Sequence, residues 1–136
     1  MPDTTSALLA AAAAHLGFQV TVTAVVYPAL ARVPVPQWPA AHGAHSRAIT
    51  PVVAAVYGSL LATGAWALWS GPSPWTWATL AATAAAMLVT AFAAAPTHGR
   101  LGQGHDPRRI RFLLRADRLR TVAAAVALFA ALAAAH

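Results

Sequence analysis

The sequence predicts an all-α integral membrane protein in which four helices form a single antiparallel bundle. Hydrophobic residues make up 59% of the 136 residues and charged residues only 9%, whereas soluble domains carry about 25% charged residues. Four apolar runs nearly fill the chain, and each has about the 20 residues that a membrane-spanning helix needs. A soluble protein of this composition would expose large apolar patches to water. We therefore expect one transmembrane domain over residues 1–136.

The first half of the chain contains two predicted spans joined by a proline-rich loop. The first span covers residues 6–30 and ends just before Arg32. Prolines at positions 34, 36 and 39 then interrupt helix formation, and Trp38 is expected to anchor the loop at the membrane interface. The second span covers residues 40–69. Pro51 lies inside it and is expected to kink the helix, because proline removes one backbone hydrogen bond.

The second half contains two further spans and a longer loop. The third span is predicted over residues 75–95, and the four tryptophans around the preceding turn are expected to form an aromatic belt. Residues 96–105 are expected to be a loop. Asp106 and Pro107 then form a helix start, with an N-cap followed by proline at the first helical position. The fourth span covers residues 107–135, cationic as far as Arg120 and apolar beyond it, and the sequence shows no internal repeat.

The arginines predict the orientation of this bundle. All nine Lys and Arg residues are arginines, and none lies in the loop between the second and third spans. Cytoplasmic loops are enriched in positive charge. We therefore expect the arginine-rich loops in the cytoplasm and both termini outside, in a bacterial inner (cell) membrane. The lipid bilayer is the expected partner, with homo-oligomers an option; no nucleic acid is expected, because topology and anionic headgroups account for the arginines.

Histidines give the first candidate site. His42 and His45 are separated by three residues on one helix, and His98 is expected at the same membrane level. Imidazole binds iron, copper and zinc, so these three residues are candidate metal ligands, with His15 as a further one. The alternatives are that His15 is a buried neutral histidine bonded to a neighbouring helix and that the other three are unsatisfied histidines at the membrane interface. The chain has no cysteine, which excludes thiolate ligands and thiolate nucleophiles.

A second interpretation of the same region is acid–base catalysis. Tyr57 lies on the histidine-bearing face of the second span, where its hydroxyl needs a partner. Asp117 is a carboxylate at the entrance to the fourth span, and it is expected to pair with Arg120 or Arg47. Such groups can exchange protons with a substrate. The candidate catalytic residues are His42, His45, Tyr57 and Asp117.

Cationic and aromatic side chains give the candidate substrate-binding residues. The glycines at 99, 102 and 104 precede a helix start that carries two arginines, an arrangement that attracts anions. It is either a flexible loop at the headgroups or a site for an anionic group of a lipid-like substrate. The candidate substrate-binding residues are Arg47, Trp38, Arg115, Arg118 and Gln19.

Several short motifs follow one another along the chain. The first half carries Val26-Tyr27-Pro28, Arg32-Val33-Pro34, Trp38, His42, His45-Ser46-Arg47 and Ile49-Thr50-Pro51. The second half carries Pro96-Thr97-His98-x-x-Leu101-x-x-Gly104-x-Asp106 and Leu114-x-x-Asp117-x-x-Arg120-Thr121. In this order they resemble small four-span bacterial membrane proteins of uncharacterised function, over most of the chain. Helix count and a few polar positions are also loosely similar to the anthrone-oxygenase-like membrane family, a resemblance that implies oxidation of polycyclic phenols and assigns no catalytic residue.

These observations predict a membrane-embedded enzyme that acts on a lipophilic small molecule. A histidine-ligated metal oxygenase or another redox enzyme is one form of this hypothesis. A cofactor-free cyclase or isomerase that uses His, Tyr and Asp as acids and bases is the second. A non-enzymatic protein that binds lipid or stabilises a partner subunit is the third.

Overall fold

All regular structure in residues 3–136, the part of the chain that the computed structural model describes, is helical, which confirms the predicted all-α class. The elements are α1 (Thr4–Thr21), a π-helical turn (Val22–Val26), α2 (Tyr27–Ala31), a 3₁₀ turn (Val35–Gln37), α3 (Trp38–Trp69), α4 (Pro74–Val89), a second π-helical turn (Thr90–Ala94), α5 (Ala95–Leu101) and α6 (Pro107–Ala134).

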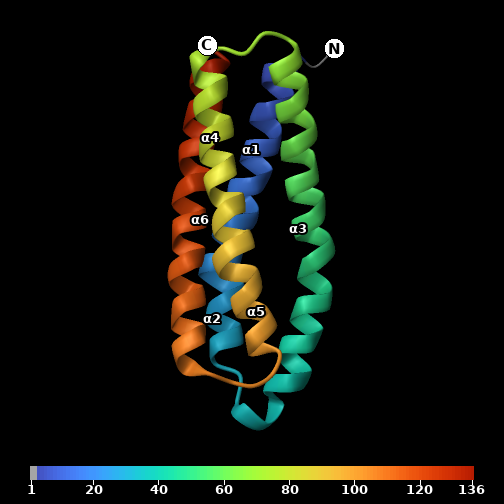
Figure 1. Cartoon of the computed structure of the whole chain (residues 1–136), viewed down its shortest axis with the longest axis vertical. Coiled ribbons are helices and arrows are strands. Elements are labelled where there is room, and N and C mark those ends of the chain that lie inside the picture. The colour runs from blue at the N-terminus through green and yellow to red at the C-terminus, as the bar shows by residue number, and fades with distance from the viewer. Residues whose placement is uncertain (1–2) are drawn as a thin grey trace.

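These elements make four helical rods, because each π-helical turn continues directly into the helices on either side. The rods are α1 with α2, α3, α4 with α5, and α6. They lie side by side and are linked at alternate ends (Figure 1). We call the end that holds both chain termini the terminal end and the opposite one the loop end. α6 packs against α4 and α1, and α1 packs against α3, whereas α3 and α4 contact each other much less.

Polar caps fix where two of the rods begin. Ser73 and Thr76 form a capping box at the start of α4, each side chain pairing with the other residue's backbone N–H. Asp106 accepts hydrogen bonds from the backbone N–H groups of Arg108 and Arg109, at 2.8 and 3.3 Å, which confirms the predicted helix start. The bond from Arg108 lowers the pKa of Asp106 below its usual value. The ionised Asp106 carboxylate therefore stabilises the start of α6 until the pH falls through this lowered pKa.

Two kinds of contact hold the rods together. At the loop end a cluster of larger side chains is buried, comprising Val22, Tyr27, Leu30, Trp38, Ala94, Leu101 and Leu113. Along the rest of the length, α4 meets α6 through small side chains, among them Thr79, Ala86, Ala124 and Ala127, which have no exposed surface. Small side chains let helix backbones approach closely. α3 buries the fewest residues for its length, so it is the rod held least tightly.

The third rod extends beyond its predicted end near residue 95 and continues through Pro96 to Leu101. The second π-helical turn explains this difference. Its wider hydrogen bonding joins the N–H of Ala95 to the carbonyl of Thr90, and the helix resumes with Pro96 near its start, where a missing N–H costs little. The first rod uses the same arrangement, with Tyr27 bonded to Val22 just before Pro28. α3 passes through Pro51 as one unbroken helix.

The two halves of the chain repeat one pattern that the sequence did not reveal. The π-helical turns begin at Val22 and Thr90, which are 68 residues apart, half the chain length. The same interval separates Pro28 from Pro96. Each half therefore consists of a rod bearing a π-helical turn followed by an uninterrupted one.

Within residues 3–136, three helical segments are long and apolar enough to cross a membrane: Thr4–Ala31, Val35–Trp69 and Pro74–Leu101. α6 is as long, but the arginines of its first half set it apart from these. Large apolar side chains such as Leu61, Phe92 and Phe129 are 63 to 78% exposed on the outside of the rods. A surface of this kind suits an apolar surrounding medium.

Gly64 of α3 packs directly against the side chain of Leu80 in α4. A Cβ atom at this position would lie 2.8 Å from the terminal Cδ2 atom of Leu80. Because that methyl group can rotate away, Gly64→Ala should change stability little. Gly64→Leu should cost about 1–3 kcal/mol by forcing the rods apart, measured by chemical unfolding in detergent micelles. The matched control is Gly58→Leu, since a Cβ at Gly58 meets no atom within 4 Å; an equal loss in both variants would contradict this account.

Candidate functional site

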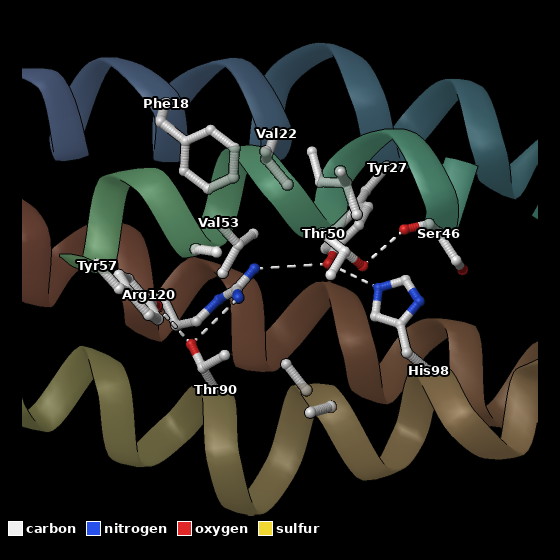
Figure 2. Close-up of a pocket in the computed structure, with 14 residues that line it drawn as sticks. Phe18, Val22, Tyr27, Ser46, Thr50, Val53, Tyr57, Thr90, His98 and Arg120 are labelled. Atoms are coloured by element: carbon white, nitrogen blue, oxygen red, sulfur yellow. Dashed lines mark hydrogen bonds between the residues drawn. The ribbon is translucent and has the colours of Figure 1, made fainter. Parts of the chain in front are cut away.

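A cavity of about 420 Å³ lies between α3 and the other three rods, toward the loop end (Figure 2). α3 forms its longest wall, because this rod is the least tightly packed. Apolar side chains line one part of the cavity and polar ones gather around Arg120 and His98. The lining residues are Phe18, Val22, Tyr27, Ser46, Ile49, Thr50, Val53, Ala54, Tyr57, Thr90, Ala94, Ala95, His98 and Arg120.

Both π-helical turns face this cavity, through Val22 of the first and Thr90 and Ala94 of the second. A π-helical turn adds a residue to the helix and frequently occurs at functional sites. Here the two turns also allow the rods to continue past Pro28 and Pro96. In the third rod, residues on both sides of Pro96, among them Ala95 and His98, therefore line the cavity, whereas the first rod lines it only with residues before Pro28.

A buried ion pair lies behind the polar wall. Arg120 and Asp117 are 4% and 1% exposed, and their nearest atoms, Nη2 and Oδ1, are 2.5 Å apart. Asp117 also accepts hydrogen bonds from Gln19 Nε2, at 3.4 Å, and from the hydroxyl of Thr23. Both carboxylate oxygens are therefore satisfied, as a buried charge requires. Gln19 and Asp117 are brought together here, as orienting partners of Arg120.

Arg120 leads into a series of contacts that extends to the loop end. Its Nη2 donates a long bond of 3.5 Å to the hydroxyl of Tyr27, which is 2.9 Å from His98 Nε2. His98 Nδ1 is 3.2 Å from His42 Nε2. We call these five residues, from Asp117 through Arg120, Tyr27 and His98 to His42, the polar chain.

Trp38 supports the outer end of the polar chain. Its indole stacks on the His42 ring, with centroids 5.2 Å apart, and its Nε1 donates to the carbonyl of Leu101 at 2.9 Å. The ring of His105 also packs against Trp38, in a T-shaped arrangement with centroids 5.0 Å apart. Trp38, 2% exposed, is therefore a buried packing residue beside the site and not an interfacial anchor.

Tyr57 presents its hydroxyl at the inner part of the cavity. It lies 2.5 Å from the Thr90 hydroxyl, whose own proton is donated to the carbonyl of Ala86. Thr90 therefore accepts from Tyr57, and it also accepts from Arg120 Nη1 at 3.3 Å. The lone pairs of the Tyr57 oxygen remain available to a molecule in the cavity.

The four candidate metal ligands do not surround a common point. Within residues 3–136, no group of three or more His, Cys, Asp or Glu side chains is arranged to hold a metal ion. His42 and His98 point their nitrogens at each other, and His45 stacks on His98 with centroids 5.6 Å apart. His15 is fully buried against Tyr57. Among residues 3–136, neither ring nitrogen of His15 has a hydrogen-bond partner.

None of the five candidate substrate-binding residues lines the cavity. Arg47, Arg115 and Arg118 are exposed, whereas Trp38 and Gln19 are buried beside it. The cavity arginine is instead Arg120, which sequence reasoning treated only as an ion-pair partner. Tyr27 and Thr90 were also missed. A signal for Thr90 exists, because it continues the face of α4 that carries the buried residues Thr76, Thr79, Thr83 and Ala86.

Comparisons of this chain with family models, with curated proteins and with solved structures give no match.

Proposed function

We propose that the chain is inserted in a bacterial inner membrane as an antiparallel four-helix bundle, with its loop end in the cytoplasm. The three long apolar segments and the exposed apolar side chains support insertion. Exposed arginines at the loop end, including Arg32, Arg100 and Arg108, support this orientation. Membership of the four-span bacterial family that the motifs resemble is part of the same proposal.

Within the membrane, we propose that the protein is an enzyme that binds a lipophilic small molecule and moves a proton on it, as a cofactor-free isomerase or cyclase does. The single observation that carries this proposal is the cavity, apolar on one side and edged on the other by the polar chain. A lipid-binding protein without catalysis needs the cavity alone. Among residues 3–136 the histidines do not converge as metal ligands, which gives the metal-oxygenase hypothesis less support.

Each polar residue at the cavity has a chemical role in this proposal. The substrate's rings or chain pack against Phe18, Val22 and Val53. Arg120, held in place by Asp117, stabilises negative charge that develops on a substrate oxygen. Tyr27, bonded to His98, accepts or donates the proton. All of these groups lie on rods and not in loops, which keeps their geometry fixed.

Filling the cavity should abolish ligand binding. Val53→Trp places an indole in the cavity, and we expect the purified variant to lose at least about nine-tenths of any lipophilic molecule that wild type retains, since bound ligands need a largely preformed pocket. Solvent extraction and mass spectrometry measure the retained molecule. The matched control is Val52→Trp, whose position is 44% exposed and does not line the cavity. Equal retention by the two variants would contradict the proposed site.

The molecule that the wild-type protein retains also tests the proposed proton transfer. The retained molecule, incubated with wild-type protein in D₂O, should exchange a carbon-bound hydrogen for deuterium. His98→Gln should keep the molecule but slow this exchange by about 10²-fold or more, the usual contribution of an acid–base residue. Retention with no exchange in wild type would favour the lipid-binding alternative.

A further inference from the structure

We propose that Tyr27, His98 and His42 form a proton relay that connects the cavity with the aqueous phase at the loop end. This inference rests on the proposed acid–base function and deepens it. Its new element is His42, which does not line the cavity. His42 is therefore a positioning and relay residue that acts through His98, without touching the substrate.

The relay is a continuous path of hydrogen-bond distances across three rods. Tyr27 of the first rod lines the cavity, and its hydroxyl is 2.9 Å from His98 Nε2 on the third rod. The other nitrogen of His98, Nδ1, is 3.2 Å from His42 Nε2 on the second rod. Both nitrogens of His98 are thus engaged, one on the cavity side and one on the loop side. This is the connection that proton transfer through an imidazole ring requires.

Arg120 determines the direction in which hydrogen bonds are donated along the polar chain. A guanidinium group has donors only, so the Tyr27 hydroxyl accepts from Arg120 and keeps its own proton for donation. In the proposed relay it donates that proton to His98 Nε2. His98 then carries its proton on Nδ1 and donates it to His42 Nε2, and His42 carries its proton on Nδ1. The fixed cation thereby favours one tautomer for both rings.

This arrangement is ready to remove a proton from the cavity. A substrate proton passes to the Tyr27 oxygen as the proton of Tyr27 moves to His98 Nε2. The Nδ1 proton of His98 moves to His42 Nε2. The Nδ1 proton of His42, which is 4% exposed and lies at the loop end, then leaves to water. One proton leaves the cavity, the substrate keeps the bonding electron pair, and no residue of the chain changes charge. The reverse sequence returns a proton to a different atom of the substrate, which completes an isomerisation.

His15, His45 and His105 do not offer such a path. His45 Nε2 and both nitrogens of His15 have no hydrogen-bond partner among residues 3–136. The ring of His105 packs against Trp38 at a nearly perpendicular angle. His42 and His105 therefore both pack on Trp38, but only His42 is bonded to His98. This difference makes His105→Gln the matched control for a His42→Gln variant.

Nuclear magnetic resonance of the full-length protein, labelled with ¹⁵N-histidine in lipid nanodiscs, tests the relay without any substrate. We expect His98 and His42 both to carry the ring proton on Nδ1. In His42→Gln, the amide oxygen can accept from His98 but cannot pass a proton on. Exchange of the His98 Nδ1 proton with water should therefore slow by about tenfold or more, because it then needs a local opening of the structure. His105→Gln should leave this rate unchanged.

Two results would overturn the relay: a ring proton on Nε2 of His98 in wild type, or equal exchange rates in His42→Gln and wild type. The tautomer measurement uses wild type alone, so it remains decisive if a variant does not fold. If the tautomers and rates are as expected but no retained molecule exchanges deuterium, the relay stands and the proposed enzymatic function fails. If deuterium exchange occurs and the Nδ1 rate does not depend on His42, the function stands and the relay fails.

Discussion

Replacing Arg120 with methionine should destabilise the protein by about 3–5 kcal/mol, the usual cost of leaving a buried charge without its partner. Asp117 is 1% exposed and would keep only the bonds from Gln19 and Thr23 to balance its charge. Thr90 and Tyr27 would each lose a donor as well. Chemical unfolding in detergent micelles, followed by far-UV circular dichroism, measures the loss.

Two further variants make this result specific. Arg118→Met removes the same charge two residues earlier on the same helix, where the side chain is exposed, and it should change stability by no more than about 0.5 kcal/mol. The double variant Asp117→Leu with Arg120→Met removes both charges and should recover a large part of the loss. If Arg118→Met were as destabilising as Arg120→Met, overall charge and not the buried pair would be responsible.

Replacing Trp38 with alanine should cost a similar amount, about 3–5 kcal/mol, because it empties the largest buried site in the loop-end core. The indole also joins two rods, since its N–H bonds the carbonyl of Leu101 at the end of the third rod. Trp38→Phe fills much of the space but leaves that carbonyl without a donor, so an intermediate loss of about 1–3 kcal/mol is expected. The same unfolding measurement applies.

Trp69 is the matched control for this prediction. It is also a tryptophan, but it lies at the terminal end and is 93% exposed. Trp69→Ala should leave the unfolding free energy within about 0.5 kcal/mol of wild type. In Trp38→Ala, we expect His42 to lose its preference for a ring proton on Nδ1, and in Trp69→Ala we expect it to keep that preference. This result would connect the packing of Trp38 to the polar chain. Equal losses of stability in both variants would contradict the structural difference between them.

The sequence was sufficient to predict the helices and those helix ends that neighbouring residues determine. Composition predicted the all-α class, and the Asp106-Pro107 pair predicted the start of α6, because caps depend on neighbouring residues alone. The spacing of Asp117 and Arg120 predicted their pairing as one of two alternatives, and the structure shows Arg120 and not Arg47 as the partner. The end of the third rod was missed because proline is expected to stop a helix, and no local pattern identified the π-helical turn that precedes it.

Tyr27 shows why much of the site could not be predicted. In a continuous α-helix, the eight residues from Gln19 to Tyr27 would place the two side chains about 80° apart around the axis. The π-helical turn between them has more residues per turn and removes roughly this offset. Tyr27 is thereby directed into the interior, where it meets His98 and Arg120. Arg120 was missed as a cavity residue because, apart from Asp117 on its own helix, its hydrogen-bond partners Tyr27 and Thr90 come from two other rods.

The repeated pattern of the two halves has a consequence for how such a site arises. The links from Arg120 to Tyr27, from Tyr27 to His98 and from His98 to His42 each join one half of the chain to the other. Neither half alone holds a working set of groups. Each half supplies one rod with a π-helical turn and one uninterrupted rod, so the polar chain exists only where the two halves meet.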